Sequence, residues 1–211
     1  MIARSPIAPA APVEVVDGWE VSTRRSTAAL RLADLTWLAK VAVKAAANGA
    51  FTADHPVAFG SARRSSPDEL EVGSDPGGWL TIGPVGAGAA LVERIAAEVT
   101  GADELVSVID LTHGRALMRL TGPQSRGVLA KLCAIDLADE ATPNLRAFRS
   151  TVAKLVTDVV RDDLADGTRS YLLHCERSSG QFLFDCLLDA GAELYIDVAG
   201  PAAEDRTRIL S

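Results

Sequence analysis

The side chains best suited to chemistry lie in the second half of the chain, and the first of them is His113. It stands in a turn between two segments that alternate apolar and polar residues, in the stretch DLTHGRALMRL. A loop histidine can act as a base, bind a metal or only shape the turn. Because no cluster of carboxylates, cysteines or histidines at metal-ligand spacing lies nearby in sequence, we assign His113 a structural or interface role. His55 and His174 are also expected to be structural.

A cysteine and three carboxylates are the other candidates. Cys133 follows Lys131 closely, and a nearby ammonium can lower the pKa of a thiol. No histidine neighbours it in sequence, so we expect Cys133 to be a packing residue at a helix end. Asp158 lies near the acidic pair Asp162 and Asp163. Paired acids can transfer protons, but an acidic pair before the glycine-containing turn LADGT is expected to be solvated.

Two further patterns argue against a bound phosphate or metal. The glycine-rich stretch GPVGAGAAL at residues 83–91 matches neither G-x-x-x-x-G-K-[ST] nor G-x-G-x-x-G in a βαβ unit, so its glycines are assigned to turns. The three cysteines include no C-x-x-C pair, which disfavours a zinc site and a disulfide framework. The residues therefore predict no catalytic constellation and no metal site.

Composition sets the class of protein. The 211 residues are 48% hydrophobic and 23% charged, which excludes global disorder. The 21 Lys and Arg against 28 Asp and Glu give a net charge of -7, which argues against a nucleic-acid partner. No apolar run approaches the ~18 residues that cross a bilayer, and the first residues lack an apolar signal-peptide region. We therefore expect a cytoplasmic protein with no membrane contact, in keeping with its few cysteines.

An alternation of strands and helices must position these side chains. In the first half, period-2 patterns predict strands at residues 28–32, 39–45, 56–64 and 79–83. Turn formers dominate residues 65–78, which predicts an exposed loop. Leu91, Ile95 and Val99 stand at four-residue steps, so we expect an amphipathic helix over residues 87–99.

The second half repeats this order. Strands are expected at residues 105–111, 115–121, 152–160, 171–174 and 193–198. One helix is expected to start at Gly122-Pro123 and to reach Leu132, and a second to cover residues 178–190 behind a serine N-cap.

The two halves also share a short sequence. Asp34-Leu35-Thr36 and Asp110-Leu111-Thr112 each follow an apolar strand and precede an alternating one. This indicates an internal duplication and predicts an α+β fold of two interlocked α/β subdomains. We expect one domain over residues 14–211, with subdomains at about 14–104 and 105–200 and a short tail. Residues 1–13 are rich in proline and predict an extended arm, either disordered or lying on a partner subunit.

Three stretches resemble the gamma subunit of heterotetrameric sarcosine oxidase: VIDLTH at 108–113, LTGPQS at 120–125 and LAKLCAIDL at 129–137. That family has a Ser-His-Arg turn, an L-x-G-P helix start and a K-G-C-P-L-D-L segment after the helix. In this chain Gly114 separates the histidine from the arginine. The resemblance extends over almost the whole chain through Ser5-Pro6, through the strand around Trp79 and through Phe182 with Leu187-Leu188.

The gamma-subunit family is in turn similar to the folate-binding fold of the glycine-cleavage aminomethyltransferase. There, D-[VL]-S-H also precedes a strand and an L-x-G helix start. The resemblance implies the same two interlocked subdomains that the duplication predicts. In that enzyme a catalytic aspartate follows a Gly-Gly turn, and the nearest counterpart in this chain is Thr157-Asp158, which lacks the glycines.

The resemblance implies an accessory, non-catalytic gamma-type subunit of a bacterial heterotetrameric complex that oxidatively demethylates an N-methyl amine. Such a chain docks on and stabilises the alpha subunit, in a complex that also contains a beta subunit. It binds no cofactor alone, because FAD, FMN, NAD and tetrahydrofolate belong to the partner subunits. The alternatives are a stand-alone tetrahydrofolate-binding, aminomethyltransferase-like enzyme and a scaffold for an unrelated partner. The candidate pocket or subunit-interface residues are Thr112, His113, Arg115, Lys131, Cys133, Asp136 and Asp158.

Overall fold

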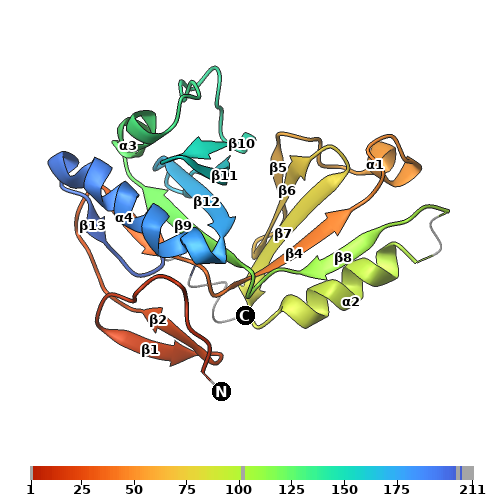
Figure 1. The fold of residues 1–211 in the computed structure, drawn as a ribbon, viewed down its shortest axis with the longest axis horizontal. Coiled ribbons are helices and arrows are strands. Elements are labelled where there is room, and N and C mark those ends of the chain that lie inside the picture. Colours follow the sequence, from red (N-terminus) through yellow and green to blue (C-terminus); the bar gives the residue numbers. More distant parts are fainter. Residues whose placement is uncertain (1, 101–102, 203–204, 206–211) are drawn as a thin grey trace.

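Two β-sheets form the body of the molecule in the computed structural model, which describes residues 2–100, 103–202 and 205. The sheets diverge from a common crossing point, so that the molecule is V-shaped in Figure 1. Helices α3 and α4 lie on the outer side of the six-stranded arm, and α1 and α2 accompany the five-stranded arm.

The five-stranded sheet is antiparallel, with the strand order β5-β6-β7-β4-β8. Its strands are β4 (Leu38–Lys44), β5 (Ala62–Ser66), β6 (Glu69–Asp75), β7 (Gly78–Val85) and β8 (Ser107–Asp110). The helices of this arm are α1 (Ala50–Asp54) and α2 (Gly88–Glu98). Leu91 and Ile95 of α2 are buried against Val41 and Trp79, so the predicted apolar face of this helix is confirmed.

The six-stranded sheet has the strand order β10-β11-β12-β9-β3-β13. Its strands are β3 (Arg31–Asp34), β9 (Arg115–Thr121), β10 (Ala147–Val152), β11 (Leu155–Arg161), β12 (Ser170–Glu176) and β13 (Asp197–Val198). The helices are α3 (Ser125–Leu132) and α4 (Gly180–Gly191), with short 3-10 turns η1 (Arg177–Ser179) and η2 (Ala192–Leu194). Buried side chains of both helices, including Val128 and Leu187, pack on this sheet.

Each sheet takes one strand from the other half of the sequence. Strand β3 comes just before β4 but pairs with β9 in the six-stranded sheet, and β8 comes just before β9 but pairs with β4 in the five-stranded sheet. The chain therefore crosses twice between the sheets. The subdomains are interlocked, and a single boundary near residue 104 does not separate them.

A layer of buried side chains joins the two sheets. Leu70, Leu80 and Ile82 of the five-stranded sheet belong to the same cluster as Leu117 and Leu172 of the six-stranded sheet. Burial of a side chain of this size contributes roughly 1.5–3 kcal/mol. The arms therefore pack as one body near their crossing.

The N-terminal arm packs on its own chain. Ile7 is fully buried in the core beneath α4, and the backbone N–H of Ala8 donates a hydrogen bond to Gln181 over 2.7 Å. The following residues form a hairpin of β1 (Val13–Val16) and β2 (Trp19–Ser22), which the sequence analysis missed. The described residues of the arm therefore lie against the body of their own chain.

Strand β6 is the main departure from the sequence prediction. Residues 69–75 form an inner strand with Leu70 fully buried, where we expected an exposed loop. The many turn formers of this segment made the alternation of Leu70 and Val72 hard to recognise in the sequence. Some of them, such as Gly77 with a φ of 72°, form the tight turns at the ends of the strand, while Gly73 and Asp75 belong to the strand itself.

Two other segments also differ from their predictions. Residues 147–161 form the β10–β11 hairpin rather than one strand at 152–160. Its turn places Ala153 and Lys154 at positive φ, 51° and 67°, a conformation in which glycine or asparagine is usual, so the sequence carries no turn signal there. Near the end of the chain, the expected strand at 193–198 shrinks to two residues, and Ser179 makes no side-chain cap at α4. Within the described residues, no helix is long and apolar enough to span a membrane.

Candidate functional site

A polar cluster surrounds Asp158 on β11. Arg149 on β10 and His174 on β12 are its direct neighbours across the sheet. Arg149 Nε lies 2.6 Å from Asp158 Oδ1, while Arg115 Nη2 and His174 Nδ1 lie 3.3 Å and 3.4 Å from Asp158 Oδ2. Arg115 also forms an ion pair with Glu176, its cross-strand neighbour. The carboxylate is therefore engaged by three side chains at once.

These contacts set the protonation of the cluster. Burial alone would raise the pKa of Asp158, but hydrogen bonds with His174 and Arg149 outweigh it and bring that pKa to about 2. Burial lowers the pKa of His174 to about 4, and the hydrogen bond to Asp158 offsets only part of this. At neutral pH the pair is a carboxylate and a neutral imidazole. A carboxylate with so low a pKa is a weak general base.

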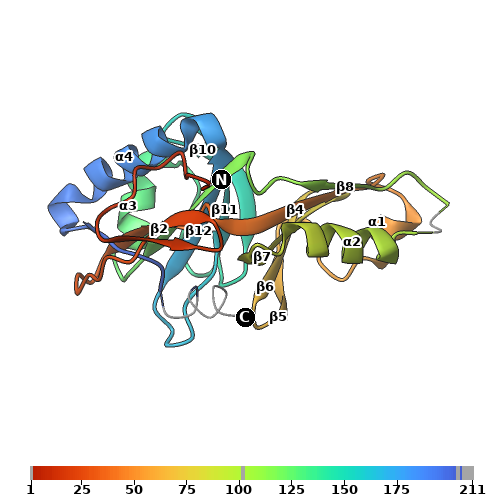
Figure 2. The ribbon, with the colours of Figure 1, turned by 90° about the horizontal axis from the view of Figure 1, so that it is seen from below.

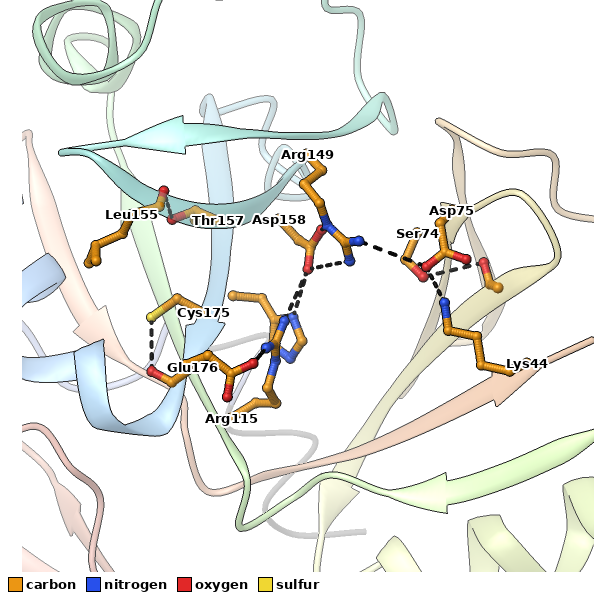
Figure 3. A network of polar contacts seen from close by, with 12 residues as sticks. Lys44, Ser74, Asp75, Arg115, Arg149, Leu155, Thr157, Asp158, Cys175 and Glu176 are labelled. Atoms are coloured by element: carbon orange, nitrogen blue, oxygen red, sulfur yellow. Dashed lines mark hydrogen bonds and ion pairs between the residues drawn. The ribbon is translucent and has the colours of Figure 1, made fainter.

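The cluster continues across the gap between the sheets (Figure 3). Arg149 Nη1 lies 3.9 Å from Oδ2 of Asp75, at the end of β6, and Lys44 of β4 pairs with the same carboxylate. Charges of opposite sign thus alternate from Lys44 to Asp158, with Arg149 between the two carboxylates. This chain of ion pairs ties the rims of the two arms together.

The inner side of the cluster borders a very small cavity. It measures about 20 Å³, lies between the sheets and is lined by His174, Asp158 and apolar side chains such as Leu80 and Val160. Nε2 of His174 is buried and has no hydrogen-bond partner among the described residues. A volume of this size suits about one water molecule. It leaves no room for an organic substrate beside the carboxylate.

A second ionic network has a fully buried centre, formed by Arg119, Asp162 and Asp205. Nη2 of Arg119 on β9 lies 2.8 Å from Asp162 Oδ2 and 3.1 Å from Asp205 Oδ1. Arg64, from the other sheet, reaches Asp162 over 2.5 Å. Asp162 is 1% exposed, so the prediction of a solvated acidic pair is wrong for this residue. The ladder continues past β11, because the backbone N–H of Asp162 donates to the carbonyl of Ser170 and thereby holds the side chain over Arg119.

Sequence reasoning missed Arg119, Arg149 and their roles. The sequence contains one indication that Arg119 is functional or structural, since its charge lies inside an otherwise apolar strand. It contains no such indication for Arg149, because the strand that carries this residue was not predicted.

The seven residues predicted as pocket or interface candidates do not form one site. Arg115 and Asp158 meet in the cluster described above. Thr112 is buried in the turn after β8, where its Oγ1 accepts a hydrogen bond from the Lys40 N–H over 3.1 Å. His113 stacks on Trp19, with ring centroids 4.7 Å apart and an interplanar angle of 12°.

The remaining three candidates lie around the end of α3. Nζ of Lys131 donates to the carbonyl of Ala190 and to Glu193, each over 2.6 Å, and so ties α3 to the end of α4. Cys133 is buried in the core and acts as the packing residue that we expected. Asp136 accepts a hydrogen bond from the Ala138 N–H over 2.9 Å and shapes the loop.

Larger hollows lie elsewhere. A groove of about 690 Å³ beside β3 and β9 is lined by Arg25 and Arg31, with Asp166 as a carboxylate at its wall. A cavity of about 420 Å³ lies on the five-stranded arm, where His55 stacks on Trp79 with centroids 3.9 Å apart. The part of the chain that the structure describes contains no group of three or more His, Cys, Asp or Glu side chains that could hold a metal ion.

Comparison with known proteins shows the family to which this chain belongs. A family model described as GCVT N-terminal domain matches residues 79–209. The chain belongs to this family. Human mitochondrial dimethylglycine dehydrogenase is 28% identical over 136 residues, which are 64% of this chain and 15% of that protein. The chain thus spans about a seventh of the length of this relative.

Solved structures that share the fold include the following two. One is a chain of heterotetrameric sarcosine oxidase from Corynebacterium sp. U-96, with a TM-score of 0.66 and 20% identity over 81% of this chain and 88% of that one. The other is glycine cleavage system aminomethyltransferase T from Bartonella henselae, with a TM-score of 0.73 and 16% identity over 99% of this chain and 62% of that one. At these identities the likeness shows the fold alone. The predicted aminomethyltransferase-like, folate-binding fold class is confirmed.

Proposed function

We propose that this chain is an accessory, non-catalytic gamma-type subunit of a heterotetrameric, sarcosine-oxidase-like complex that oxidatively demethylates an N-methyl amine in the cytoplasm. In this proposal it docks on the alpha subunit and stabilises it. FAD, FMN, NAD and tetrahydrofolate are bound by the partner subunits, alpha and beta, and this chain alone binds none of them.

The observation that carries the proposal is the lack of the enzyme's motif around Asp158. The resemblance to the glycine-cleavage aminomethyltransferase implies a catalytic aspartate after a Gly-Gly turn, and the nearest counterpart in this chain, Thr157-Asp158, lacks the glycines.

The state of Asp158 supports the same conclusion. Its carboxylate is held by two arginines and a histidine and faces a cavity of about 20 Å³. This cavity is too small for a pterin ring, and the low pKa of Asp158 makes its carboxylate a poor proton acceptor. The match to a sarcosine oxidase chain supports the subunit assignment further, since it covers most of both chains.

Co-expression tests the proposal. The chain, carrying an affinity tag, is produced alone and together with the subunits encoded beside its gene, and the purified material is examined for flavin absorbance. We expect the chain alone to associate or precipitate, and the co-expressed chain to elute in one complex with a flavin-bearing subunit. A stable, monodisperse monomer that captures no flavin-bearing subunit would contradict the proposal.

A second candidate function is a stand-alone tetrahydrofolate-binding enzyme. The groove of about 690 Å³ favours it, because the N–H groups of a pterin need an acceptor and Asp166 lies at the groove wall. Calorimetric titration of the isolated chain with tetrahydrofolate separates the two functions. Micromolar binding that is lost in Asp166→Asn but kept in Asp158→Asn would favour the enzyme, and no binding would favour the accessory subunit.

A further inference from the structure

The outer edge of strand β1 is open. Strand β1 pairs only with β2, in a separate two-stranded sheet. In Figure 1 it lies at the outer boundary of the molecule, with β2 between it and the six-stranded arm. Figure 2, seen from below, again shows this hairpin on the near side of the molecule. A two-stranded hairpin is marginally stable by itself, and here β2 supplies the buried residues, Trp19 and Val21.

The register of the hairpin defines which groups face outward. The backbone N–H of Thr23 donates to the carbonyl of Pro12, so by alternation Glu14 and Val16 are bonded to β2 while the N–H and C=O groups of Val13 and Val15 point away from it. The side chains of Val13 and Val15 are 39% and 57% exposed. The edge thus combines unused backbone donors and acceptors with two exposed β-branched side chains.

The other sheet edges are protected. The edges of β5 and β10 carry arginines, such as Arg63 and Arg149, and touch each other through a bridge between Ser61 and Arg146. Strand β13 has only two residues, and β8 is packed by α2. Charge, shortness and covering helices are the usual devices that prevent strand addition. Strand β1, with the sequence VEVV, contains neither a proline nor a basic residue.

The charge of the residues on and beside β1 indicates which kind of strand could pair with its open edge. Glu14 forms no ion pair with any described residue, and the turn that follows β1 adds Asp17. A second copy of the chain would bring a second Glu14 onto the same short ladder, where like charges repel. A strand with apolar side chains beside Val13 and Val15 and a Lys or Arg beside Glu14 satisfies both the backbone groups and the charge.

We propose that the β1 edge receives an extended, basic-apolar segment of the partner subunit, which adds a third strand to the hairpin. This inference rests on the proposed function, because it assumes that a partner subunit exists. Main-chain hydrogen bonds would supply the affinity, and the alternating side chains would supply the specificity.

Two substitutions at one position test the edge. Val15→Pro removes an outward N–H but no hydrogen bond to β2, and proline is tolerated on an edge strand. Val15→Lys places a charge on the same edge. The matched control is Val156→Lys, because Val156 is 65% exposed but lies on β11, which is paired on both sides. Each variant is co-expressed with the flanking subunits, its affinity for the flavin-bearing subunit is measured, and its Tm is recorded to establish folding.

The expected result is an affinity at least tenfold weaker for both Val15 variants, with Tm and the Val156→Lys affinity unchanged. Hydrogen exchange should show the Val15 amide becoming protected in the complex, while the Glu14 amide is protected with or without the partner. If both Val15 variants kept the wild-type affinity, the proposal that the β1 edge binds the partner would be wrong, and the proposed function would be unaffected. If the wild type captures no flavin-bearing subunit, both fall. If it forms a dimer that Val15→Pro dissolves, the occupant is a second copy, which overturns the assigned partner.

Discussion

Thr36 and Thr112 make the same contacts in the two halves of the chain. The N–H of each donates to the aspartate two residues earlier, over 2.9 Å at Asp34 and 2.8 Å at Asp110. The Oγ1 of each accepts a backbone N–H from the opposite crossing strand, from Leu117 over 3.2 Å and from Lys40 over 3.1 Å. The repeated Asp-Leu-Thr sequences therefore form the two turns at which the subdomains interlock.

We expect Thr36→Val and Thr112→Val to lower the free energy of unfolding by about 1–2 kcal/mol each, because each leaves a buried backbone N–H without its acceptor. Urea denaturation measures the loss. Thr27→Val, at an exposed threonine, serves as the control and should stay within about 0.5 kcal/mol of wild type. Equal stability of all three variants would show that the turns are not held by these hydroxyls.

The duplication was readable from sequence because both copies of this turn keep the same three residues. The exchange of β3 and β8 between the sheets was not, since strand pairing depends on register and on partners 63 to 90 positions away. The hydrogen bonds of Leu117 with Thr36 and of Lys40 with Thr112 illustrate the role of register. The second copy has one extra residue, Gly114, between the turn and the strand, so the two copies do not align residue for residue. Local alternation predicted β9 to the residue, but it could not predict the strand beside it.

Lys40 should make the free energy of unfolding depend on pH in the alkaline range. Its side chain is fully buried, and Nζ donates to the carbonyls of Thr36 and Leu38, each over 2.7 Å. Burial lowers its pKa to about 7, against which Asp34 works only in part. Between pH 7 and the unfolded pKa of about 10.4, the unfolded chain holds a proton that the folded chain has lost. The free energy of unfolding should therefore gain up to ~1.4 kcal/mol per pH unit from this group.

Lys40→Met should abolish that gain. The comparison is the slope of unfolding free energy against pH between 7 and 9, measured by denaturant titration in wild type, in Lys40→Met and in Lys131→Met. Lys131 lies on the surface and provides the control. Parallel slopes for wild type and Lys40→Met would contradict the assignment, whatever the absolute stability of the variant.

His174 and Asp158 should make the free energy of unfolding fall in two steps as the pH is lowered. The folded pKa of His174 is about 4, below its unfolded value, so stability should fall as pH drops from about 6.5 towards 4. The folded pKa of Asp158 is about 2, so its contribution is present above pH 3.8 and lost as pH falls towards 2. His174→Phe should remove the first step and Asp158→Asn the second. His113→Phe, at an exposed ring, should keep both, and loss of the first step in that control would sink the assignment.

The cluster itself shows what sequence could not supply. Asp158 was singled out from sequence, and so was Arg115. Their partners Arg149 and His174 were not, although all four meet on adjacent strands. Arg149 and Asp158 are nine residues apart and become neighbours only through the hairpin at Ala153-Lys154, which has no glycine to announce it. An ion-pair partner across a sheet depends on register, and a one-residue slip would place each side chain on the opposite face.

Removing a charge from the buried pair of Arg119 with Asp162 should lower the free energy of unfolding more than removing an exposed charge. Arg119→Met leaves Asp162 and Asp205 buried without their shared cation, although Arg64 still reaches Asp162. Breaking a buried pair from one side costs about 3–5 kcal/mol. Arg94→Met removes an exposed arginine that pairs with Glu69 and Glu98, and exposed pairs are worth about 1 kcal/mol or less. Chemical denaturation should therefore separate the two variants by at least about 2 kcal/mol, and equal losses would mean that Arg64 alone can hold Asp162.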